Sequence, residues 1–319
     1  MTINKEKYIN LCKTEKTIPI FSQVFWLNAV AGPNNWDVVI VENKNHEIIG
    51  AMPYVWKKKY GFKILTMPKL TQTLGPWLKY PENQKNHSRL SFEKKIMTQL
   101  IEQLPKFNYF TQNLHYSITN WLPFYWKGFQ QTTLYTYIIK DLTDLDIVFN
   151  RFDYSKIKNI KRAEEIVTVK TDMSSKEFYK NHKYTLKKQN KMISYSYNLF
   201  DKIYNTTHKN KQSKIFYAID KKHNLHSAIF VIWDNIEAYD LISTIDPDYK
   251  NSGATSLLIK TAIEYISKIV TKFNFEGSMI EGVEQSFRKF GAIQKPYFKI
   301  TKTNSKLIKL GLCLKNILK

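Results

Sequence analysis

Residues 272–292 read KFNFEGSMIEGVEQSFRKFGA. The apolar start of this stretch predicts a strand over 272–276, and the small residues that follow Glu276 predict a turn. Helical spacing then indicates a short helix over 281–289. Gly291 marks a second turn before 297–301, an apolar run that predicts another strand. The stretch therefore predicts a strand, a turn, a short helix and a strand, in that order.

The residues before this stretch show a pattern that also occurs in the first half of the chain. Upstream of residue 272, strands are expected over 214–219, 227–233 and 237–244, followed by an amphipathic helix over 253–269. The first half repeats the whole order over 37–41, 47–56, 62–66, 90–104, 107–112, 118–126 and 131–139. We interpret the repeat as an internal duplication of one β-rich α/β unit, with a spacing of roughly 160 residues.

A basic stretch with helical spacing lies between the two repeats. Ser174 and Glu177 form the S-x-x-E pattern of a capping box, which predicts a helix from there to about Asn190. A second helix is expected over 197–208. We therefore expect three parts. These are a first domain at 1–153, a basic connector at 154–210 that belongs to the second domain, and that second domain at 211–319.

The composition excludes several classes of protein. The chain is 43% hydrophobic and 14% aromatic, so it can bury a sizeable core, and disorder is excluded as its main state. Cys12 and Cys313 lie at opposite ends, which excludes a disulfide scaffold and offers no zinc site. The N-terminus lacks the apolar core of a signal peptide, and no apolar run approaches the roughly 20 residues of a membrane span. We expect a cytoplasmic protein.

The charge allows two interpretations. The chain has 49 Lys and Arg against 27 Asp and Glu, a formal charge of +22 that suggests neutralisation of nucleic-acid phosphates. Only four of the basic residues are arginine, although the planar guanidinium is better suited than an ammonium to recognise phosphate or guanine. Asn and Ile are also abundant, as expected from a genome rich in A and T, so solvated lysines can account for much of the charge.

Four stretches together resemble one family of proteins. They read PKLTQTLGPW at 68–77, KNIKRA at 158–163, FEGSM at 275–279 and FRKFGA at 287–292. They resemble the FemAB/FemX-like family of tandem GNAT acyltransferases, which includes peptidoglycan-bridge aminoacyltransferases and proteins associated with surface-polysaccharide synthesis. The resemblance extends over about residues 36–302. It implies an α/β fold of two tandem GNAT (acyl-CoA N-acyltransferase-like) domains, each with a mixed central sheet flanked by helices.

The loop before the helix at 253–269 is the expected donor site. A turn with glycine that opens a helix presents backbone N–H groups and the positive end of the helix dipole to an anion such as a pyrophosphate. The position resembles the acyl-donor loop of GNAT proteins, whose counterparts here are Lys250, Ser252, Gly253, Ala254 and Thr255. The alternative is that Gly253 only permits tight packing. The first repeat has no comparable loop, so we expect its domain to be structural.

The FEGSM stretch is the expected catalytic centre. Glu276, at the end of a strand, is a candidate to hold the acceptor amine and accept its proton. Alternatively, it caps the backbone amides of the turn. Ser278 is a candidate to bind the acceptor, with N-capping of the next helix as its alternative role.

The last helix and strand contain candidate contacts to an anionic substrate. These are Arg288, Lys289 and Tyr297, with a solvated basic face as the alternative for the two cations. The peptidoglycan-bridge enzymes tend to read Phe-Lys-x-x-Phe-Gly here, whereas this chain has Phe287 in place of the lysine. The difference favours acyl-CoA over aminoacyl-tRNA as the donor substrate, unless Arg288 or Lys289 replaces the lysine. No metal is expected.

Two further segments are candidate binding surfaces. Lys158, Lys161 and Arg162, together with Lys156, are spaced to lie along one broad helical face that could contact tRNA. The tail, 303–319, predicts a basic amphipathic helix that could lie on an anionic membrane surface, on the inner face of the membrane. The alternative is that its apolar face packs on the second unit.

The sequence thus leads to two hypotheses. The first is an enzyme that transfers an acyl or aminoacyl group to an amine on a cell-envelope or polysaccharide precursor. The second is a non-enzymatic nucleic-acid or membrane-surface adaptor made of two degenerate GNAT units.

Overall fold

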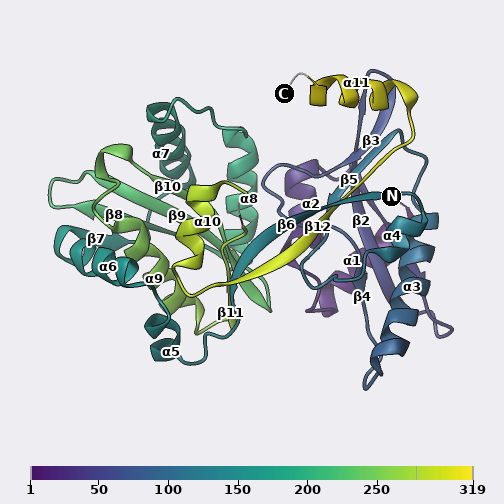
Figure 1. The fold of residues 1–319 in the computed structure, drawn as a ribbon, viewed down its shortest axis with the longest axis horizontal. Helices are drawn as coiled ribbons and strands as arrows, with labels where there is room; N and C mark the ends of the chain where they lie inside the picture. Colours follow the sequence, from purple (N-terminus) through teal and green to yellow (C-terminus); the bar gives the residue numbers. More distant parts are fainter. Residues whose placement is uncertain (1, 278, 318–319) are drawn as a thin grey trace. The chain divides into compact units, whose positions relative to one another are not determined.

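The computed structural model describes residues 2–277 and 279–317. The chain forms two compact units (Figure 1). Unit 1 contains Met1–Leu134 and Pro296–Lys319, and unit 2 contains Tyr135–Lys295. No helix among the described residues is both long enough and apolar enough to cross a membrane.

Unit 1 is a sheet covered by helices on both faces. Its strand order is β1-β2-β3-β5-β12, and β4 pairs with β2. On β1, Val38 and Ile40 pack in one apolar cluster, and Val39 and Val41 pack in another, as expected from the alternation of side chains along a strand. Its elements are α1 (Ile3–Thr14), η1 (Ile20–Ser22), α2 (Val24–Ala31), β1 (Trp36–Glu42), β2 (Ile48–Lys59), β3 (Phe62–Thr66), β4 (Trp77–Leu78), α3 (Asn86–Glu102), β5 (Tyr109–Asn113), α4 (Leu122–Trp126) and α11 (Lys306–Ile317).

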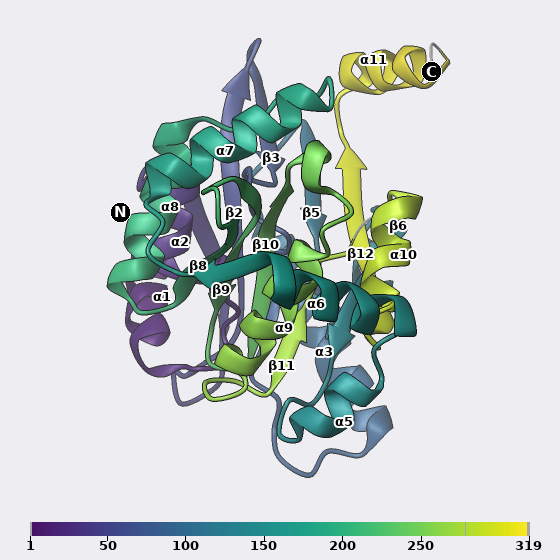
Figure 2. The ribbon, with the colours of Figure 1, turned by 90° about the vertical axis from the view of Figure 1, so that its left-hand side faces the viewer.

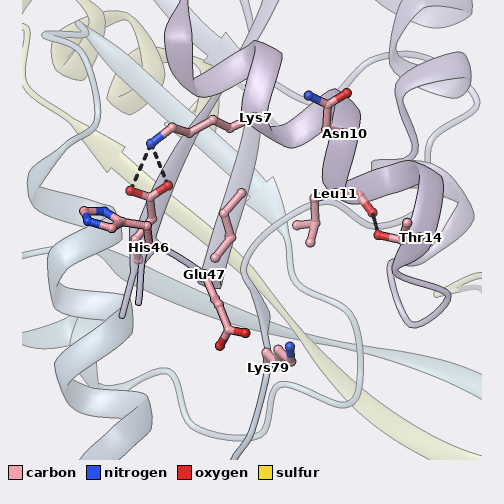
Figure 3. Close-up of a pocket in the computed structure, with 9 residues that line it drawn as sticks. Lys7, Asn10, Leu11, Thr14, His46, Glu47 and Lys79 are labelled. Atoms are coloured by element: carbon pink, nitrogen blue, oxygen red, sulfur yellow. Dashed lines mark hydrogen bonds and ion pairs between the residues drawn. The ribbon is translucent and has the colours of Figure 1, made fainter. Parts of the chain in front are cut away.

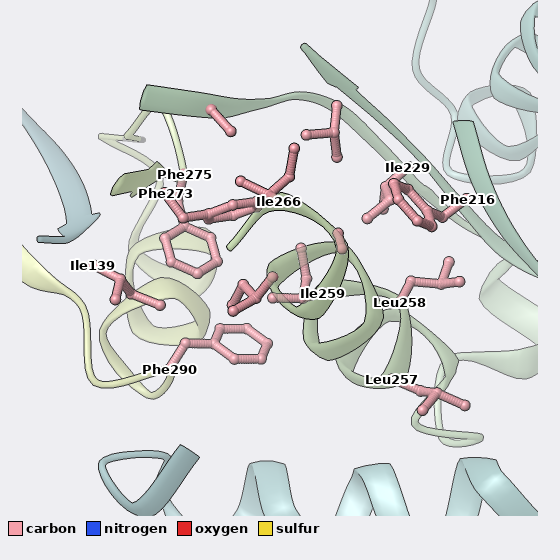
Figure 4. Close-up of a cluster of buried hydrophobic side chains, with 14 of the residues drawn as sticks. Ile139, Phe216, Ile229, Leu257, Leu258, Ile259, Ile266, Phe273, Phe275 and Phe290 are labelled. Atoms are coloured by element: carbon pink, nitrogen blue, oxygen red, sulfur yellow. The ribbon is translucent and has the colours of Figure 1, made fainter. Parts of the chain in front are cut away.

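Unit 2 is organised around α9. Its strand order is β6-β11-β10-β9-β8-β7. Figure 4 shows Phe273, Phe275 and Phe290 gathered beside α9, whose own apolar side chains are buried in the same cluster. Its elements are α5 (Leu145–Asn150), α6 (Tyr154–Ile166), β7 (Val167–Lys170), α7 (Ser175–Lys188), α8 (Tyr197–Lys209), β8 (Ser213–Asp220), β9 (Leu225–Trp233), β10 (Glu237–Ile245), η2 (Pro247–Tyr249), α9 (Ala254–Ile266), β11 (Lys272–Asn274) and α10 (Glu281–Arg288).

Two strands cross from one unit to the other. β6 (Gln130–Ile139) begins in unit 1, but its last residues pair with β11 in unit 2, with Ile139 opposite Phe273. β12 (Ile293–Thr303) begins in unit 2, and its residues 299–303 pair with β5 in unit 1. The last strand of each repeat thus contributes to the sheet of the other unit. The compact units therefore do not follow the predicted boundaries at 153 and 211.

Most predicted elements are present, with a few differences. The capping box forms as expected, since Ser174 Oγ accepts from the Glu177 backbone N–H and the Glu177 side chain accepts from that of Ser174. The strand predicted over 272–276 ends at Asn274 because Glu276 and Gly277 have left-handed φ angles of 60° and 81°, which a strand cannot contain. The helices α1, α2 and α5 and the short strands β4 and β7 were not predicted.

Candidate active site

The parallel strands β10 and β11 separate in unit 2. Their pairing joins Glu237–Tyr239 with Lys272–Asn274 and ends there among the described residues. On the β10 side, the register with β9 shifts between Asp240 and Ile242, so Leu241 is an extra residue in the ladder. On the β11 side, Glu276 and Gly277 turn the chain away. The ends of the two strands therefore diverge around Asp240 and Glu276.

The turn after β11 is fixed by contacts to β6. An added Cβ at Gly277 would lie 2.0 Å from the Tyr135 carbonyl oxygen, so only glycine fits this close approach. Asn274 Oδ1 accepts hydrogen bonds from the Glu276 backbone N–H at 2.8 Å and from Thr136 Oγ1 at 2.6 Å. Buried Asn274 thus holds Glu276 in its left-handed conformation.

Asp240 and Glu276 are two carboxyls where the strands diverge, and we call them the carboxyl pair. Asp240 is buried and Glu276 is half-buried. Burial raises the pKa of Asp240 to about 6, while a 2.7 Å hydrogen bond from the Ser243 hydroxyl opposes that rise. Burial also raises the pKa of Glu276 well above its usual range, and the charges of Asp240 and Glu237 raise it further. Asp240 therefore ionises first, and its charge helps to keep the proton on Glu276. Both shifts favour retention of a proton by the pair.

Packing alone does not explain why an aspartate is buried at position 240. Its side chain is 6% exposed, and its Oδ1 is buried without a hydrogen-bond partner among the described residues. Leaving a carboxylate oxygen in this state costs free energy, and such sites are more frequent where function requires them. Sequence reasoning selected Glu276 but missed Asp240, although a single aspartate in the apolar strand EAYDLISTI was an available signal.

The expected donor loop is closely packed against α6. Gly253 has φ 82°, and an added Cβ would lie 2.1 Å from the carbonyl oxygen of Asn159. Ser252 Oγ accepts from the Ala254 backbone N–H at 3.2 Å, and Thr255 Oγ1 lies 2.9 Å from the Ser227 hydroxyl. These contacts account for Gly253 without a ligand. Lys250 is exposed at the start of the loop, and donor binding by these residues stays a prediction.

The expected anion-binding residues are distributed over both units. In unit 2, Arg288 Nε lies 3.7 Å from Glu284 Oε1, and Lys289 Nζ lies 4.0 Å from Asp153 Oδ1. Tyr297 belongs to unit 1, where its hydroxyl accepts a 3.1 Å hydrogen bond from Gln72 Nε2. Ser278 lies outside the described residues. The two cations thus already have acidic neighbours.

Lys156 is buried, which corrects the predicted basic face of α6. Its Nζ donates to Ser286 Oγ at 2.7 Å and lies 4.2 Å from the centre of the Phe290 ring. Burial lowers the pKa of Lys156 to about 8, and the charge of Lys289 lowers it further. The other residues of the expected tRNA surface remain accessible to different degrees, with Lys158 and Lys161 exposed and Arg162 half-buried. Arg162 donates to the Asn251 carbonyl at 2.6 Å.

Phe287 takes part in the core of unit 2. Its ring centre lies 5.2 Å from that of Phe275, directly before Glu276. Lys156 reaches the neighbouring Ser286 from another helix. An amino group is therefore present one residue from the position at which the bridge enzymes have a lysine. This amino group belongs to Lys156 in α6, which is far from the motif in the sequence, so the motif could not predict it.

The hollow shown in Figure 3 belongs to unit 1 and is separate from the carboxyl pair. It has a volume of about 450 Å³, and Lys7, Glu42, Glu47 and Lys79 are among the residues that line it. Lys7 Nζ bonds both carboxylate oxygens of Glu42, at 2.7 and 3.0 Å. None of its lining residues belongs to the carboxyl pair, so we do not assign the chemistry to it. No group of three side chains suited to a metal ion is found among the described residues.

Comparisons with known proteins support the fold. No family model and no curated protein matches the chain. Among solved structures, FemX has a TM-score of 0.67 at 12% identity and covers 93% of this chain and 96% of its own. The C-terminal domain of a putative lysylphosphatidylglycerol synthetase from Agrobacterium fabrum has a TM-score of 0.56 at 9% identity, with 99% and 97% covered. A tandem GNAT protein from the clavulanic acid biosynthesis pathway has a TM-score of 0.53 at 8% identity, with 95% of each chain covered. The chain thus has a FemX-like tandem GNAT fold, as predicted.

Proposed function

We propose that this chain is an acyltransferase that moves an acyl or aminoacyl group from an activated carrier to an amine on a cell-envelope or polysaccharide precursor. The observation that carries the proposal is the carboxyl pair, Asp240 and Glu276, at the point where β10 and β11 diverge. A pair with one proton and one negative charge attracts an amine and can accept its proton. The tandem GNAT fold is consistent with this chemistry, and we assign the chemistry to unit 2.

In the proposed reaction the acceptor nitrogen attacks the carbonyl carbon of the donor. A C–N bond forms, and the bond from that carbon to the sulfur or oxygen of the carrier breaks. The nitrogen becomes acidic as it attacks, and its proton passes to the Asp240 carboxylate while Glu276 keeps its own. The leaving carrier takes up a proton from water. Leu241 lies outside the regular ladder, so its backbone N–H is a candidate to stabilise the tetrahedral oxyanion.

For the donor we favour acyl-CoA over aminoacyl-tRNA. Phe287 replaces the lysine of the bridge enzymes and is packed in the core, and both Arg288 and Lys289 have acidic neighbours. The predicted contacts to the pyrophosphate of CoA come from the loop of Lys250, Ser252 and Thr255. Lys156 bonds to Ser286, next to the position of the lysine in the bridge enzymes. Aminoacyl-tRNA is therefore the second donor to be tested.

The test measures transfer from acyl-CoAs and from charged tRNA to a panel of amine acceptors. We expect Asp240→Asn to lower the rate by roughly 10²–10⁴-fold, the usual contribution of a general base. This variant keeps the shape of the side chain and an acceptor for Ser243. Glu276→Gln is expected to lower the rate much less, because the neutral amide resembles the protonated carboxyl that Glu276 keeps during the reaction.

Asp234→Asn is the matched control. Asp234 is also a buried aspartate of unit 2, but it caps the turn before β10 through hydrogen bonds from the backbone N–H groups of Ile236 and Glu237, which an asparagine oxygen can also accept. A rate in Asp240→Asn equal to that of the control would show that the pair is not the proton acceptor. Absence of transfer from every donor in the wild type would instead favour the non-enzymatic adaptor.

A further inference from the structure

One end of unit 1 brings together the β2–β3 hairpin and the start of α11. Asn108 connects them at the beginning of β5. Its backbone N–H donates to the Lys63 carbonyl at 2.9 Å, and its Oδ1 accepts from the Lys63 N–H at 2.8 Å. Its carbonyl accepts from the backbone N–H of Asn304 at 2.9 Å. Figure 2 shows the hairpin and α11 at the same end of the sheet. We call residues 57–63 and 302–314 the lysine–leucine end.

α11 carries a stripe of exposed leucines. Leu307, Leu310 and Leu314 are 70%, 60% and 52% exposed. Their spacing of three and four residues places them on one side of the helix. Within unit 1, these leucines are thus left exposed. Lys306 and Lys309 flank the stripe and are also exposed.

The hairpin adds further cations and an exposed aromatic ring. Lys57, Lys58 and Lys59 precede Tyr60, which is 87% exposed at the tip of the hairpin. Lys59 Nζ lies 5.2 Å from the centre of the Tyr60 ring. The sequence has no Asp or Glu over 48–81 or over 302–319, so no acidic side chain from these segments neutralises the lysines.

We propose that the lysine–leucine end docks on the surface of an anionic lipid bilayer. Exposure of a row of leucines to water costs free energy. The same row can enter a lipid bilayer at the boundary between headgroups and acyl chains. The lysines beside it are then at the level of the lipid phosphates, and Tyr60 has the amphipathic ring that favours this interface. α11 lies on the bilayer in this arrangement and does not span it.

The charge pattern distinguishes a bilayer from RNA as the partner. An RNA surface needs cations and ring or hydrogen-bonding contacts to the bases, and it gains nothing from three aligned leucines. A bilayer uses both the apolar stripe and the cations. The proposal does not depend on the chemistry assigned to unit 2, because docking requires only residues of unit 1.

The experiment is flotation of the full chain with vesicles. We expect wild-type protein to float with vesicles of phosphatidylglycerol and phosphatidylcholine but not with phosphatidylcholine alone. Replacing Leu307, Leu310 and Leu314 by serine should weaken the partition at least about tenfold, since three apolar side chains no longer leave water. Replacing Lys57, Lys58 and Lys59 by glutamine should weaken it by a similar factor and flatten its dependence on salt.

Two control variants match these changes away from the lysine–leucine end. Leu122→Ser with Met192→Ser removes apolar side chains that are 46% and 93% exposed elsewhere. Lys221→Gln with Lys222→Gln and Lys268→Gln removes three exposed lysines of unit 2. Both controls should float like the wild type, and thermal melts should show that all variants are folded.

Two results would overturn the proposal. One is failure of the wild type to float with anionic vesicles. The other is a leucine variant that floats as well as the wild type, because the attraction would then be one of charge alone. Displacement of that variant from vesicles by an RNA oligomer would identify RNA as the better partner for this surface.

Discussion

The two units contain the same pair of parallel strands, but the space beyond each pair is used differently. In unit 1, β3 pairs with β5 at Ile64 and Leu65, and the chain then returns to fill the space where the strands end. Asn113 Nδ2 donates to the Gln72 carbonyl at 3.0 Å, and the Leu74 N–H donates to the Asn113 carbonyl at 2.7 Å. In unit 2, the corresponding space holds Asp240 and Glu276.

This difference is consistent with the proposal that the chemistry belongs to unit 2. Neutral amides that bond to the backbone stabilise a fold and do not titrate near neutral pH. Buried carboxyls destabilise the fold but can hold and transfer protons. The prediction that the first domain is structural thus has a physical reason, which can be tested by changing single residues in each unit.

The largest change in stability is expected from the glycine that lets β6 approach the turn of unit 2. Gly277→Ala would bring a Cβ to 2.0 Å from the Tyr135 carbonyl, so we expect a loss of about 3 kcal/mol or more in the free energy of unfolding. Gly61 in unit 1 also has positive φ, at 77°, but no atom lies within 4 Å of its added Cβ. Gly61→Ala should therefore cost only about 1 kcal/mol. Equal losses in urea titrations would contradict this account of Gly277.

The second effect is a pH dependence of stability that originates in unit 2. Because the pKa of Asp240 is raised to about 6 on folding, the folded chain binds more protons than the unfolded chain between about pH 4 and 6. Stability should therefore fall as pH rises through this window, by roughly 3 kcal/mol in total. Glu276 shifts in the same direction and adds a further loss at higher pH.

Asp240→Asn removes the ionisable group and should flatten the curve between pH 4 and 6. The measurement is urea unfolding at closely spaced pH values. The transfer rate should show the opposite dependence and rise through about pH 6, since only the ionised Asp240 accepts a proton. A variant curve as steep as that of the wild type would assign the dependence to other groups.

A smaller effect should follow from giving unit 1 a carboxyl of its own. Gln112 is 1% exposed, and its Nε2 donates to the Pro53 carbonyl at 2.8 Å. Gln112→Glu removes this donor and buries an acid, so we expect a loss of about 2 kcal/mol at neutral pH that is partly recovered at acidic pH. The variant should gain no transfer activity per folded molecule. A gain would show that the first unit has kept a site.

The smallest effect concerns the donor loop. Lys250 is exposed, so Lys250→Ala should weaken acyl-CoA binding less than tenfold in calorimetry and leave the melting temperature unchanged. A substitution of Gly253 would be less informative, because its Cβ would meet the backbone of Asn159 and disturb packing first. Lys44→Ala in unit 1 is the matched control. Equal affinities for the two variants would place the donor elsewhere.

Periodicity predicted most elements because it reflects which side of each element is buried. The β3 range, 62–66, was predicted without error, since an apolar run with turn residues on both sides has few alternatives. The partners of β6 and β12 could not be predicted in this way. A strand alternates in the same manner whichever sheet it joins, so its partner depends on contacts far apart in the sequence.

The site was predicted in part for similar reasons. The small residues after Glu276 allowed its prediction, but its left-handed conformation depends on Asn274 and Thr136, which the motif does not reveal. Lys156 was assigned to a solvated face because its spacing fits one. Its burial depends on Ser286 and Phe290, which lie about 130 residues away.

The crossing of β6 restricts how the gene can evolve. The codons for residues 135–139 belong to the first copy of the duplicated segment, yet Tyr135 abuts Gly277 and Thr136 holds Asn274 in the second. Loss of the first copy would remove these supports from the carboxyl pair. Under the proposed function, selection on the carboxyl pair thus extends to the end of the first repeat, and exchange of either repeat alone would disturb it.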